Sequence, residues 1–141
     1  MIRVAVSGGF DPVHVGHIEL FEKAKMLGDW LIVIVNSDEF LIRKKGLYMM
    51  PLGDRVRIIG ALKTVDEVMP STDKDMTVSQ SLRKLRDIWS YERIIFANGG
   101  DRIEAVEEES KVCTELNIEQ VFRLGDKIRS SSDYIKNAIQ N

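Results

Sequence analysis

The two histidines of this sequence lie three residues apart, in a stretch whose composition suits phosphate chemistry. His14 and His17 belong to Gly8-Gly9-Phe10-Asp11-Pro12-Val13-His14-Val15-Gly16-His17, which follows an apolar run and opens a helical pattern. Residues i and i+3 share one face of a helix, and the N–H groups at a helix start favour an anion. The three glycines would let the backbone approach a phosphate. Both imidazoles could then donate hydrogen bonds to phosphate oxygens, most usefully as charge builds in a transition state.

The alternative for this stretch is structural, with His14 as a helix cap and His17 as a half-buried helix residue. The combination of two histidines and a glycine turn at the end of a strand favours chemistry. Two other phosphate-binding motifs, Gly-x-x-x-x-Gly-Lys-Ser/Thr and Gly-x-Gly-x-x-Gly, are absent from the sequence. The chain is therefore indicated to be neither a P-loop kinase nor an NAD-dependent enzyme.

Strand and helix patterns alternate about five times and must position the histidines. The predicted strands are Ile2–Val6, Trp30–Val35, Val65–Met69, Arg93–Ala97 and Ile118–Leu124. The predicted helices are about His14–Leu27, one opened by Pro51, one after a capping box at Thr77–Gln80, about Glu104–Leu116 and one from Ser130. The polar segment Ser37–Met50 is expected to be a loop with at most one helical turn. The fold class is α/β, a Rossmann-like open parallel sheet of about five strands with helices on both faces, in a single domain spanning residues 1–141.

In the first of these helices, one face carries an apolar residue every third position. Ile18, Phe21, Ala24 and Leu27 make up this face. We expect these four side chains to pack against the sheet.

In an open parallel sheet the ligand lies beyond the carboxyl ends of the strands. The loops expected there are Ser7–His17, Asn36–Lys45, Asn98–Arg102 and Gly125–Ser132. Candidate residues in or near them carry weaker signals than the histidines. Lys44 and Lys45 could bind a triphosphate or be a solvated pair, and Arg55 could be functional or a surface helix residue. Asp11 and Asp101 could serve the site or only shape turns.

Composition limits the possible classes of function. Of the 141 residues, 44% are hydrophobic and 30% charged, which is an ordinary globular balance. The formal net charge of -2 gives no support for a general nucleic-acid or membrane-surface binder. The lone cysteine, Cys113, allows no intrachain disulfide and is interpreted as a core residue. With no signal-peptide pattern and no apolar run of membrane-spanning length, we expect a cytoplasmic protein.

His14-Val15-Gly16-His17, preceded by Gly9-Phe10-Asp11, resembles the His-x-Gly-His signature of the cytidylyltransferase-like nucleotidyltransferases. The resemblance is strongest to the short branch with glycerol-3-phosphate cytidylyltransferase, archaeal FAD synthetase and heptose-phosphate adenylyltransferase. It extends over nearly the whole chain. Further similar segments and residues are Ser37–Phe40, Arg55, Val65–Pro70 and Ser130–Ser132.

This resemblance implies a Rossmann-like enzyme that binds an NTP with Mg²⁺. The acceptor phosphate would attack the α-phosphate in line, and pyrophosphate would leave. The implied catalytic residues are His14, His17 and Lys44. Asp38 is the implied acceptor-binding residue, and Asp11 is a candidate metal ligand. The implied nucleotide-binding residues are Gly8, Gly9, Phe10, Asp11, Gly16, Lys45, Arg55, Asn98, Gly99, Asp101, Arg129, Ser130, Ser131 and Ser132.

The sequence departs from the glycerol-phosphate branch at two places near the expected nucleotide. The late segment Arg123–Ser132 differs from the Arg-Thr-x-Gly-Ile-Ser-Thr-Thr of that branch, and Asn98 stands where several relatives have lysine or methionine. CTP is favoured as the donor, and ATP is the alternative. The acceptor stays open among polyol phosphates, sugar phosphates, phosphonates and flavin mononucleotide.

Two other classes of function compete with the enzyme. A nucleotide-binding module without turnover would have no need of both histidines. A fragment of an aminoacyl-tRNA synthetase would carry a related His-x-Gly-His, but the chain has no basic face and no anticodon-type domain. We therefore expect an NTP and a phosphorylated small molecule as partners, with neither nucleic acid nor membrane. A homodimer is expected because Val65–Pro70 resembles a segment at the dimer interface of relatives.

Overall fold

The computed structural model describes residues 1–99 and 106–124, and five parallel strands form one sheet within them. The strand order is β3-β2-β1-β4-β5, so β1 lies in the middle and the chain crosses over it once. The strands are β1 (Ile2–Gly8), β2 (Trp30–Val35), β3 (Glu67–Pro70), β4 (Arg93–Gly99) and β5 (Glu119–Leu124). This arrangement confirms the predicted Rossmann-like α/β sheet.

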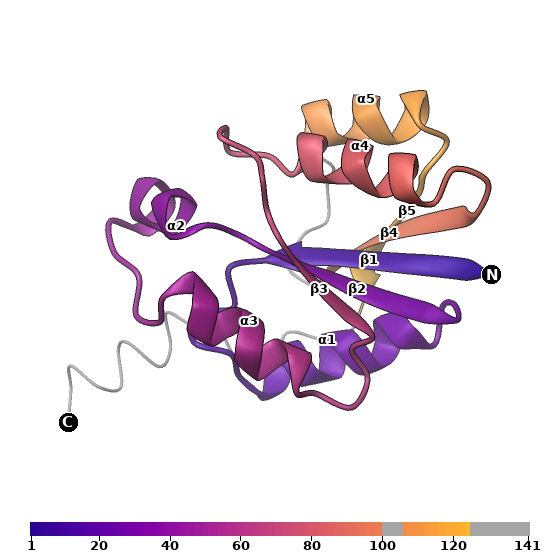
Figure 1. Cartoon of the computed structure of the whole chain (residues 1–141). Helices are drawn as coiled ribbons and strands as arrows, with labels where there is room; N and C mark the ends of the chain where they lie inside the picture. Colours follow the sequence, from indigo (N-terminus) through magenta and orange to yellow (C-terminus); the bar gives the residue numbers. More distant parts are fainter. Residues whose placement is uncertain (100–105, 125–141) are drawn as a thin grey trace.

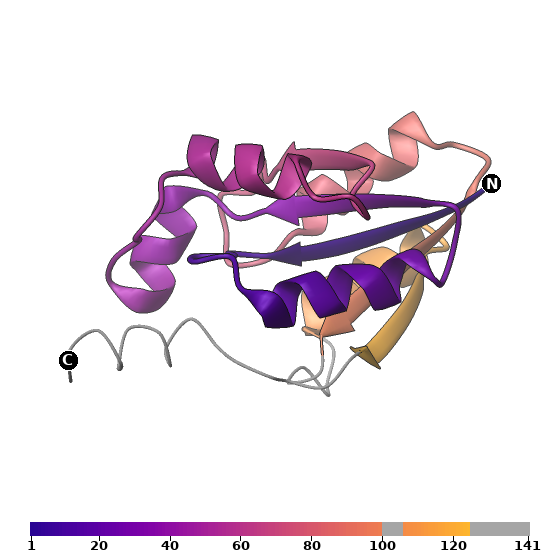
Figure 2. The ribbon, with the colours of Figure 1, turned by 90° about the horizontal axis from the view of Figure 1, so that it is seen from below.

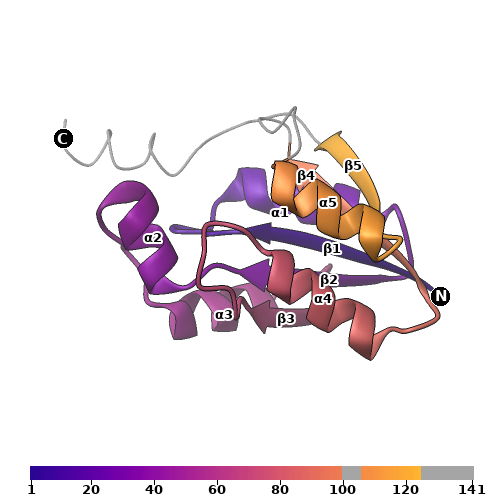
Figure 3. The same ribbon diagram turned by 90° about the horizontal axis from the view of Figure 1, so that it is seen from above.

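Helices cover both faces of the sheet (Figure 1). They are α1 (Val15–Lys25), α2 (Asp38–Lys45), α3 (Leu52–Gly60), α4 (Ser79–Ile88) and α5 (Glu107–Glu115). Figure 2 is seen from the side of α1 and α3, and Figure 3 from the side of α4 and α5. In all three views α2 stands beyond the carboxyl end of β2 and covers neither face.

Alternate residues of the central strands face opposite layers of the core. In β2, Leu31, Val33 and Val35 belong to the cluster under α1 and α3, whereas Ile32 and Ile34 belong to the cluster under α4 and α5. All five are at most 2% exposed. A strand buried on both faces reads as one continuous apolar run, which is why this element could be predicted from sequence.

The segment after β2 differs from its prediction, because Asp38–Lys45 is a helix and not a loop. Ser37 caps it, with its Oγ accepting from the Phe40 N–H at 3.0 Å. Gly46 ends it in the left-handed region at φ 86°, which a glycine adopts without strain. Acidic residues in the first turn and basic ones in the last suit the helix dipole. Only Leu41 of this helix is buried, so the apolar periodicity that marks other helices was missing.

The predicted capping box at Thr77–Gln80 does not form, because the start of α4 is capped from further upstream. The Asp73 carboxylate accepts from the N–H groups of Gln80 at 2.7 Å and Ser81 at 3.0 Å. The Thr77 Oγ1 accepts only from the Ser79 N–H, at 3.2 Å. Asp73 therefore replaces the local pair as the main cap of this helix.

One smaller prediction needs correction, and another lies outside the described residues. The α1 helix begins at Val15, and Ile18 on its expected buried face is 37% exposed, whereas Phe21 and Ala24 are fully buried. The predicted helix from Ser130 lies outside the described residues.

Cys113 is 1% exposed in the core under α4 and α5, which confirms its interpretation as a core residue. Burial, with a smaller effect of the Glu109 charge, raises the pKa of this thiol to about 11. In the described ranges, no helix is long and apolar enough to cross a membrane.

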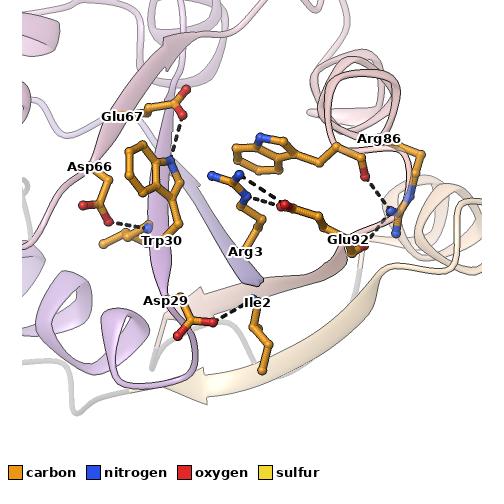
Figure 4. A network of polar contacts seen from close by, with 10 residues as sticks. Ile2, Arg3, Asp29, Trp30, Asp66, Glu67, Arg86 and Glu92 are labelled. Carbon is orange, nitrogen blue, oxygen red and sulfur yellow. Dashed lines mark hydrogen bonds and ion pairs between the residues drawn. The ribbon is translucent and has the colours of Figure 1, made fainter.

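The amino end of the sheet is closed by a network of structural contacts (Figure 4). The Arg3 guanidinium lies over the rings of Trp30 and Trp89, at 5.3 and 4.7 Å from their centroids, and pairs with Glu92. Arg86 donates to the backbone carbonyls of Trp89 at 3.0 Å and Glu92 at 2.8 Å. Because these polar groups are paired or hydrogen-bonded with one another, we interpret the contacts at the amino end of the sheet as stabilising the fold.

Candidate active site

The carboxyl ends of β1 and β4 meet at the point where the strand order reverses. These strands are neighbours, with Ala5 opposite Phe96, and the last residue of each is a glycine, Gly8 in β1 and Gly99 in β4. The α1 helix, which follows β1 in the sequence, lies on one face of the sheet, and α5, which follows β4, lies on the other (Figure 1). In open parallel sheets the usual ligand site lies beyond the strand ends at such a reversal of strand order.

His14 and His17 lie at this edge, where they cap the start of α1. The Nδ1 of His14 accepts from the Gly16 N–H at 3.1 Å, and the Nδ1 of His17 accepts from the His14 N–H at 3.2 Å. This is a capping box built from two imidazoles. The rings stack at 3.7 Å between centroids and 25° between planes. The structural interpretation of His14 as a helix cap is thus confirmed, and the chemical role of the two histidines stays a prediction.

The capping bonds also decide which ring nitrogen carries the proton. In a neutral imidazole one nitrogen is a donor and the other an acceptor. Because each Nδ1 accepts a backbone N–H, the proton of each neutral ring is on Nε2. In their neutral forms His14 and His17 therefore each carry an Nε2–H donor at a helix start, which is chemistry that suits phosphate oxygens.

The Gly8-Gly9 pair makes room for the side chains of Phe10 and Leu41. A Cβ on Gly8 would lie 2.9 Å from Cζ of Phe10, and a Cβ on Gly9 would lie 2.7 Å from Cδ2 of Leu41. Both distances are shorter than real Cβ contacts, so the structure gives these glycines a packing role besides the predicted approach to phosphate.

Phe10 is placed differently from its prediction as a nucleotide-binding residue. It is 4% exposed and packs edge-on against His17, with 4.9 Å between ring centroids. It also packs against Phe21, at 5.2 Å. Phe10 therefore lies behind the histidine pair and supports it from the core.

Arg55 is likewise placed differently, because its side chain is 0% exposed. Its guanidinium donates to the carbonyls of Gly9 at 2.8 Å, Asn36 at 2.7 Å and Met50 at 2.9 Å. It also donates to Oδ1 of Asp38 at 2.6 Å. Arg55 is therefore not a surface residue, and all three of its guanidinium nitrogens donate within the protein, while its predicted contact with a nucleotide stays a prediction. It is a positioning residue that joins the ends of β1 and β2 to α2 and to the segment before α3.

Asp11 is 1% exposed and fastens the segment before α3 to the histidine loop. Its two carboxylate oxygens accept from the N–H groups of Met49 and Met50, each at 2.6 Å. Asp11 thus has a structural role, but its partners belong to a distant segment and not to the local turn that was predicted, and its role at the phosphate or metal site stays a prediction. In the described ranges, no group of three or more histidine, cysteine, aspartate or glutamate side chains is arranged to hold a metal ion.

The two lysines lie in the last turn of α2, and both are exposed. Lys45 donates from Nζ to the backbone carbonyl of Asp11 at 3.3 Å, which brings its charge to the histidine loop. The Nζ of Lys44 lies 5.8 Å from the centroid of the Phe40 ring. Asp38 begins the same helix, and its side chain is one-third exposed beside Arg55.

The remaining predicted residues lie either at the end of β4 or outside the described residues. Asn98 is 4% exposed, and its Nδ2 donates to the Val121 carbonyl at 3.4 Å. Gly99 is the last residue of β4. Asp101 and Arg129, with Ser130, Ser131 and Ser132, lie outside the described residues, so their predicted contacts stay predictions.

One residue at this edge was missed by sequence reasoning. Asn36 follows β2 and is 6% exposed. Its N–H donates to the Gly8 carbonyl at 2.9 Å, and its Oδ1 is buried without a hydrogen-bond partner in the described part of the chain. A polar residue directly after a continuous apolar strand was the available signal. A buried acceptor of this kind makes Asn36 a further candidate site residue.

Comparison with known proteins agrees with this geometry. A family profile described as cytidylyltransferase-like matches residues 5–137. The chain belongs to the cytidylyltransferase-like family. Glycerol-3-phosphate cytidylyltransferase of Bacillus subtilis is 35% identical over 101 residues, which are 72% of this chain and 73% of that protein.

Other curated relatives are not named as cytidylyltransferases. FAD synthase of Archaeoglobus profundus is 45% identical over 76 residues, covering 54% of this chain and 48% of that protein. Bifunctional protein HldE of Streptomyces coelicolor is 46% identical over 89 residues, covering 61% of this chain and 19% of that protein. The chain thus spans about half or less of the length of several relatives.

A similar fold is found in solved structures. A lipopolysaccharide core biosynthesis protein from Thermoplasma volcanium has a TM-score of 0.70 and 26% identity, covering 89% of this chain and 98% of that one. A bifunctional NMN adenylyltransferase/ADP ribose pyrophosphatase from Francisella tularensis also has a TM-score of 0.70. Its identity of 15%, covering 100% of this chain and 42% of that one, shows the fold alone.

Proposed function

We propose that this chain is a nucleotidyltransferase that transfers a nucleoside monophosphate from an NTP to a phosphorylated small molecule. The observation that carries the proposal is the stacked pair His14 and His17, whose Nδ1 atoms are held by backbone N–H groups. Membership of the cytidylyltransferase-like family supports it.

In the proposed reaction an oxygen of the acceptor phosphate forms a bond to the α-phosphorus of the NTP. The bond between the α-phosphorus and the oxygen bridging to the β-phosphate breaks, and pyrophosphate leaves with that electron pair. The two Nε2–H donors stabilise the charge that builds on the α-phosphate oxygens. No covalent enzyme intermediate is needed, so positioning and electrostatics account for catalysis.

The two exposed lysines of α2 supply the cationic side of the site. Lys45 is held at the histidine loop by the Asp11 carbonyl, and Lys44 lies in the same helical turn. We assign both to the phosphates of the NTP, with Lys44 in the catalytic role. Asp38 stays the proposed acceptor contact, since a third of its side chain is exposed.

Mg²⁺ belongs to the proposal as the partner of the triphosphate, where it would neutralise phosphate charge. Magnesium keeps several waters and is commonly bound through substrate phosphates with one or two carboxylates. In the described ranges no cluster of acidic side chains is arranged to hold the ion, and the Asp11 carboxylate is buried with both oxygens accepting backbone N–H groups. We therefore assign the ion to the phosphates and not to Asp11.

CTP is the proposed donor, because a cytidylyltransferase matches 72% of this chain over 73% of its own length. ATP is the alternative, because relatives named FAD synthase and HldE also match. Pyrophosphate release, measured for each NTP against a panel of phosphorylated acceptors, tests both donors. Release that needs both NTP and acceptor supports the proposal, and a tenfold higher kcat/KM with ATP would reverse the choice of donor. If no combination of NTP and acceptor releases pyrophosphate, the proposal that the chain is a nucleotidyltransferase is refuted.

The proposal also includes a homodimer and a cytoplasmic location. β3 is a four-residue edge strand, and it includes most of the Val65–Pro70 segment that resembles a dimer interface. Light scattering at micromolar concentration tests the assembly, and a monomer mass would contradict it.

A further inference from the structure

We propose that Asn36 is a specificity-determining residue of the proposed reaction, and that its side-chain oxygen accepts a hydrogen bond from the body of the acceptor molecule. The group that fits this oxygen is a hydroxyl or an amine of the acceptor, and not an oxygen of its phosphate. This inference rests on the proposed function and names the residue that recognises the acceptor beyond its phosphate.

The side chain of Asn36 carries an unpaired hydrogen-bond acceptor. The residue is 6% exposed, and among the described residues its Oδ1 is the one buried side-chain oxygen or nitrogen atom without a hydrogen-bond partner. The buried carboxylate of Asp11 at the same edge of the sheet is satisfied, because both of its oxygens accept backbone N–H groups. A buried acceptor without a partner destabilises the fold. Such an exception therefore needs an explanation, and a group supplied by a ligand is one.

The backbone of Asn36 is held by hydrogen bonds on both sides, which fixes the position of the residue. Its N–H donates to the Gly8 carbonyl at 2.9 Å, and its own carbonyl accepts from Nη1 of Arg55 at 2.7 Å. The same Nη1 atom donates to the Gly9 carbonyl at 2.8 Å. Asn36 therefore lies beside the glycine pair from which the histidine loop begins.

The Arg55 guanidinium also joins Asn36 to the proposed acceptor contact, Asp38. Nη2 of Arg55 donates to Oδ1 of Asp38 at 2.6 Å, whereas Nη1 donates to the Asn36 carbonyl. One planar group thus holds both residues, and the Asp38 side chain beside it is one-third exposed. For this reason we assign the unpaired oxygen of Asn36 to the acceptor and not to the NTP.

The alternation of side chains along β2 gives the side of the sheet on which Asn36 lies. Ile32 and Ile34 belong to the core cluster under α4 and α5. The Ser71 N–H donates to the Val35 carbonyl at 2.8 Å, so the ladder continues to the end of β2 and Asn36 extends the row of Ile32 and Ile34. The α1 helix, whose start carries the histidines, covers the opposite face (Figure 2). The body of an acceptor that reaches Asn36 therefore lies towards the α4 and α5 side of the sheet edge.

The chemistry of a carboxamide oxygen decides which group of a substrate it can bind. Oδ1 of an asparagine accepts hydrogen bonds and cannot donate them. An ionised phosphate oxygen is also an acceptor, so it is excluded as a partner, whereas a hydroxyl or amine hydrogen is suitable. The torsion that orients a carboxamide is soft, so Oδ1 can turn towards a donor that arrives at the sheet edge. Binding of that donor would remove the cost of the unpaired acceptor.

The first test measures stability in the absence of any substrate. Asn36→Leu and Asn36→Ala both remove Oδ1, and only the leucine fills its space. At least one of the two variants should unfold in urea at a midpoint no lower than that of the wild type, because Oδ1 has no hydrogen bond to lose within the described residues. Thr114→Leu is the control, since Thr114 is exposed in the last turn of α5 and its replacement should leave the midpoint unchanged. A lower midpoint in both Asn36 variants would show that Oδ1 is already paired, for example with a buried water, and would overturn the inference.

The second test measures turnover with the phosphorylated acceptor and the NTP that give the fastest pyrophosphate release. We expect the KM for the acceptor to rise about fivefold or more in both Asn36 variants, as the loss of one hydrogen bond predicts. The kcat and the KM for the NTP should stay within about twofold, because the lost contact is to a part of the acceptor that does not react. Analogues of the acceptor that lack one hydroxyl or amine each then identify the donor. For one of them the rise in KM should be seen in the wild type and be absent in the Asn36 variants.

The possible outcomes separate this inference from the proposed function. If the wild type releases pyrophosphate and both Asn36 variants keep its KM for the acceptor, the inference is overturned and the proposed function stands. A rise in the KM for the NTP instead of the acceptor also overturns the inference, as does an equal loss for every analogue in wild type and variants. If the wild type releases no pyrophosphate with any pair of substrates, the proposed function is refuted and the inference falls with it.

Discussion

Replacing Arg55 by methionine tests whether this residue positions the site or binds the nucleotide. The substitution keeps an unbranched side chain of similar length but removes every donor. Three carbonyls and the Asp38 carboxylate would lose their partner at once. Because the Arg55 side chain is 0% exposed, water cannot replace those donors without local rearrangement.

The expected loss of stability can be worked from these contacts. Removing one partner of a buried ion pair costs about 3–5 kcal/mol, and each buried acceptor left unsatisfied costs about 1–3 kcal/mol. The Asp38 side chain is one-third exposed and can be hydrated again, so the loss from the broken ion pair lies at the low end of its range. We expect Arg55→Met to lower the free energy of unfolding by at least about 3–5 kcal/mol, a large part of the 5–15 kcal/mol typical of a domain.

Urea denaturation followed by circular dichroism measures this loss, and Arg57→Met is the matched control. Arg57 lies two residues further along α3 and is exposed, so its replacement should change stability by less than about 0.5 kcal/mol. With an m-value of about 1–3 kcal/mol/M, the midpoint for Arg55→Met should fall by roughly 1 M or more. Asp38→Asn should have a smaller effect, because it keeps an acceptor for the guanidinium.

The opposite result would refute this assignment of Arg55. If Arg55→Met unfolds at the same urea concentration as Arg57→Met but its KM for the NTP rises tenfold, then Arg55 contacts the nucleotide directly. In that case the burial of its side chain would belong only to the nucleotide-free form.

Three further predictions concern the histidines, the late arginine and the thiol. His14→Ala and His17→Ala should each lower kcat by about 100-fold or more, since each removes a donor to the transition state; a near-normal kcat in a folded variant would contradict their role. Arg129→Ala should weaken NTP binding by roughly tenfold to a hundredfold, and nucleoside monophosphate binding far less, because a charge-assisted contact to the β- and γ-phosphates is lost. Calorimetric titration of both nucleotides measures the two losses. Equal losses would show that the segment from Arg129 to Ser132 is only a helix cap. Cys113 should react with a disulfide reagent at pH 8 far more slowly in the native protein than in urea, because burial raises the pKa of its thiol to about 11 and keeps it protonated; equal rates would show that the site is open to solvent.

The elements that sequence predicted well are those whose signals are local. Every residue from Leu31 to Val35 is apolar, and a strand buried on both faces needs nothing else to be recognised. The histidine pair was also found from local pattern, because the spacing of three and the glycine turn before it are visible in the chain. The start of α1 and the strand before it could be predicted from the same local pattern.

The α2 helix was missed because its stabilising contacts are not periodic. Its cap, its glycine end and its charge order could be seen in the sequence, yet only Leu41 is buried. Part of what holds it lies elsewhere in the chain, since Arg43 donates to the Lys74 carbonyl at 2.9 Å and Lys45 to that of Asp11. Hydrophobic patterns cannot report contacts of this kind.

Only the tertiary structure decided what Arg55, Asp11 and Phe10 do. The partners of Arg55 include three carbonyls, and those of Asp11 are two backbone N–H groups. Almost every residue carries both groups, so no side-chain type marks the partner in the sequence. The residue types thus predicted phosphate chemistry at the end of β1. Folding brought distant backbone groups together, and these groups determined which polar side chains are left to face the candidate site and which hold its loops in place.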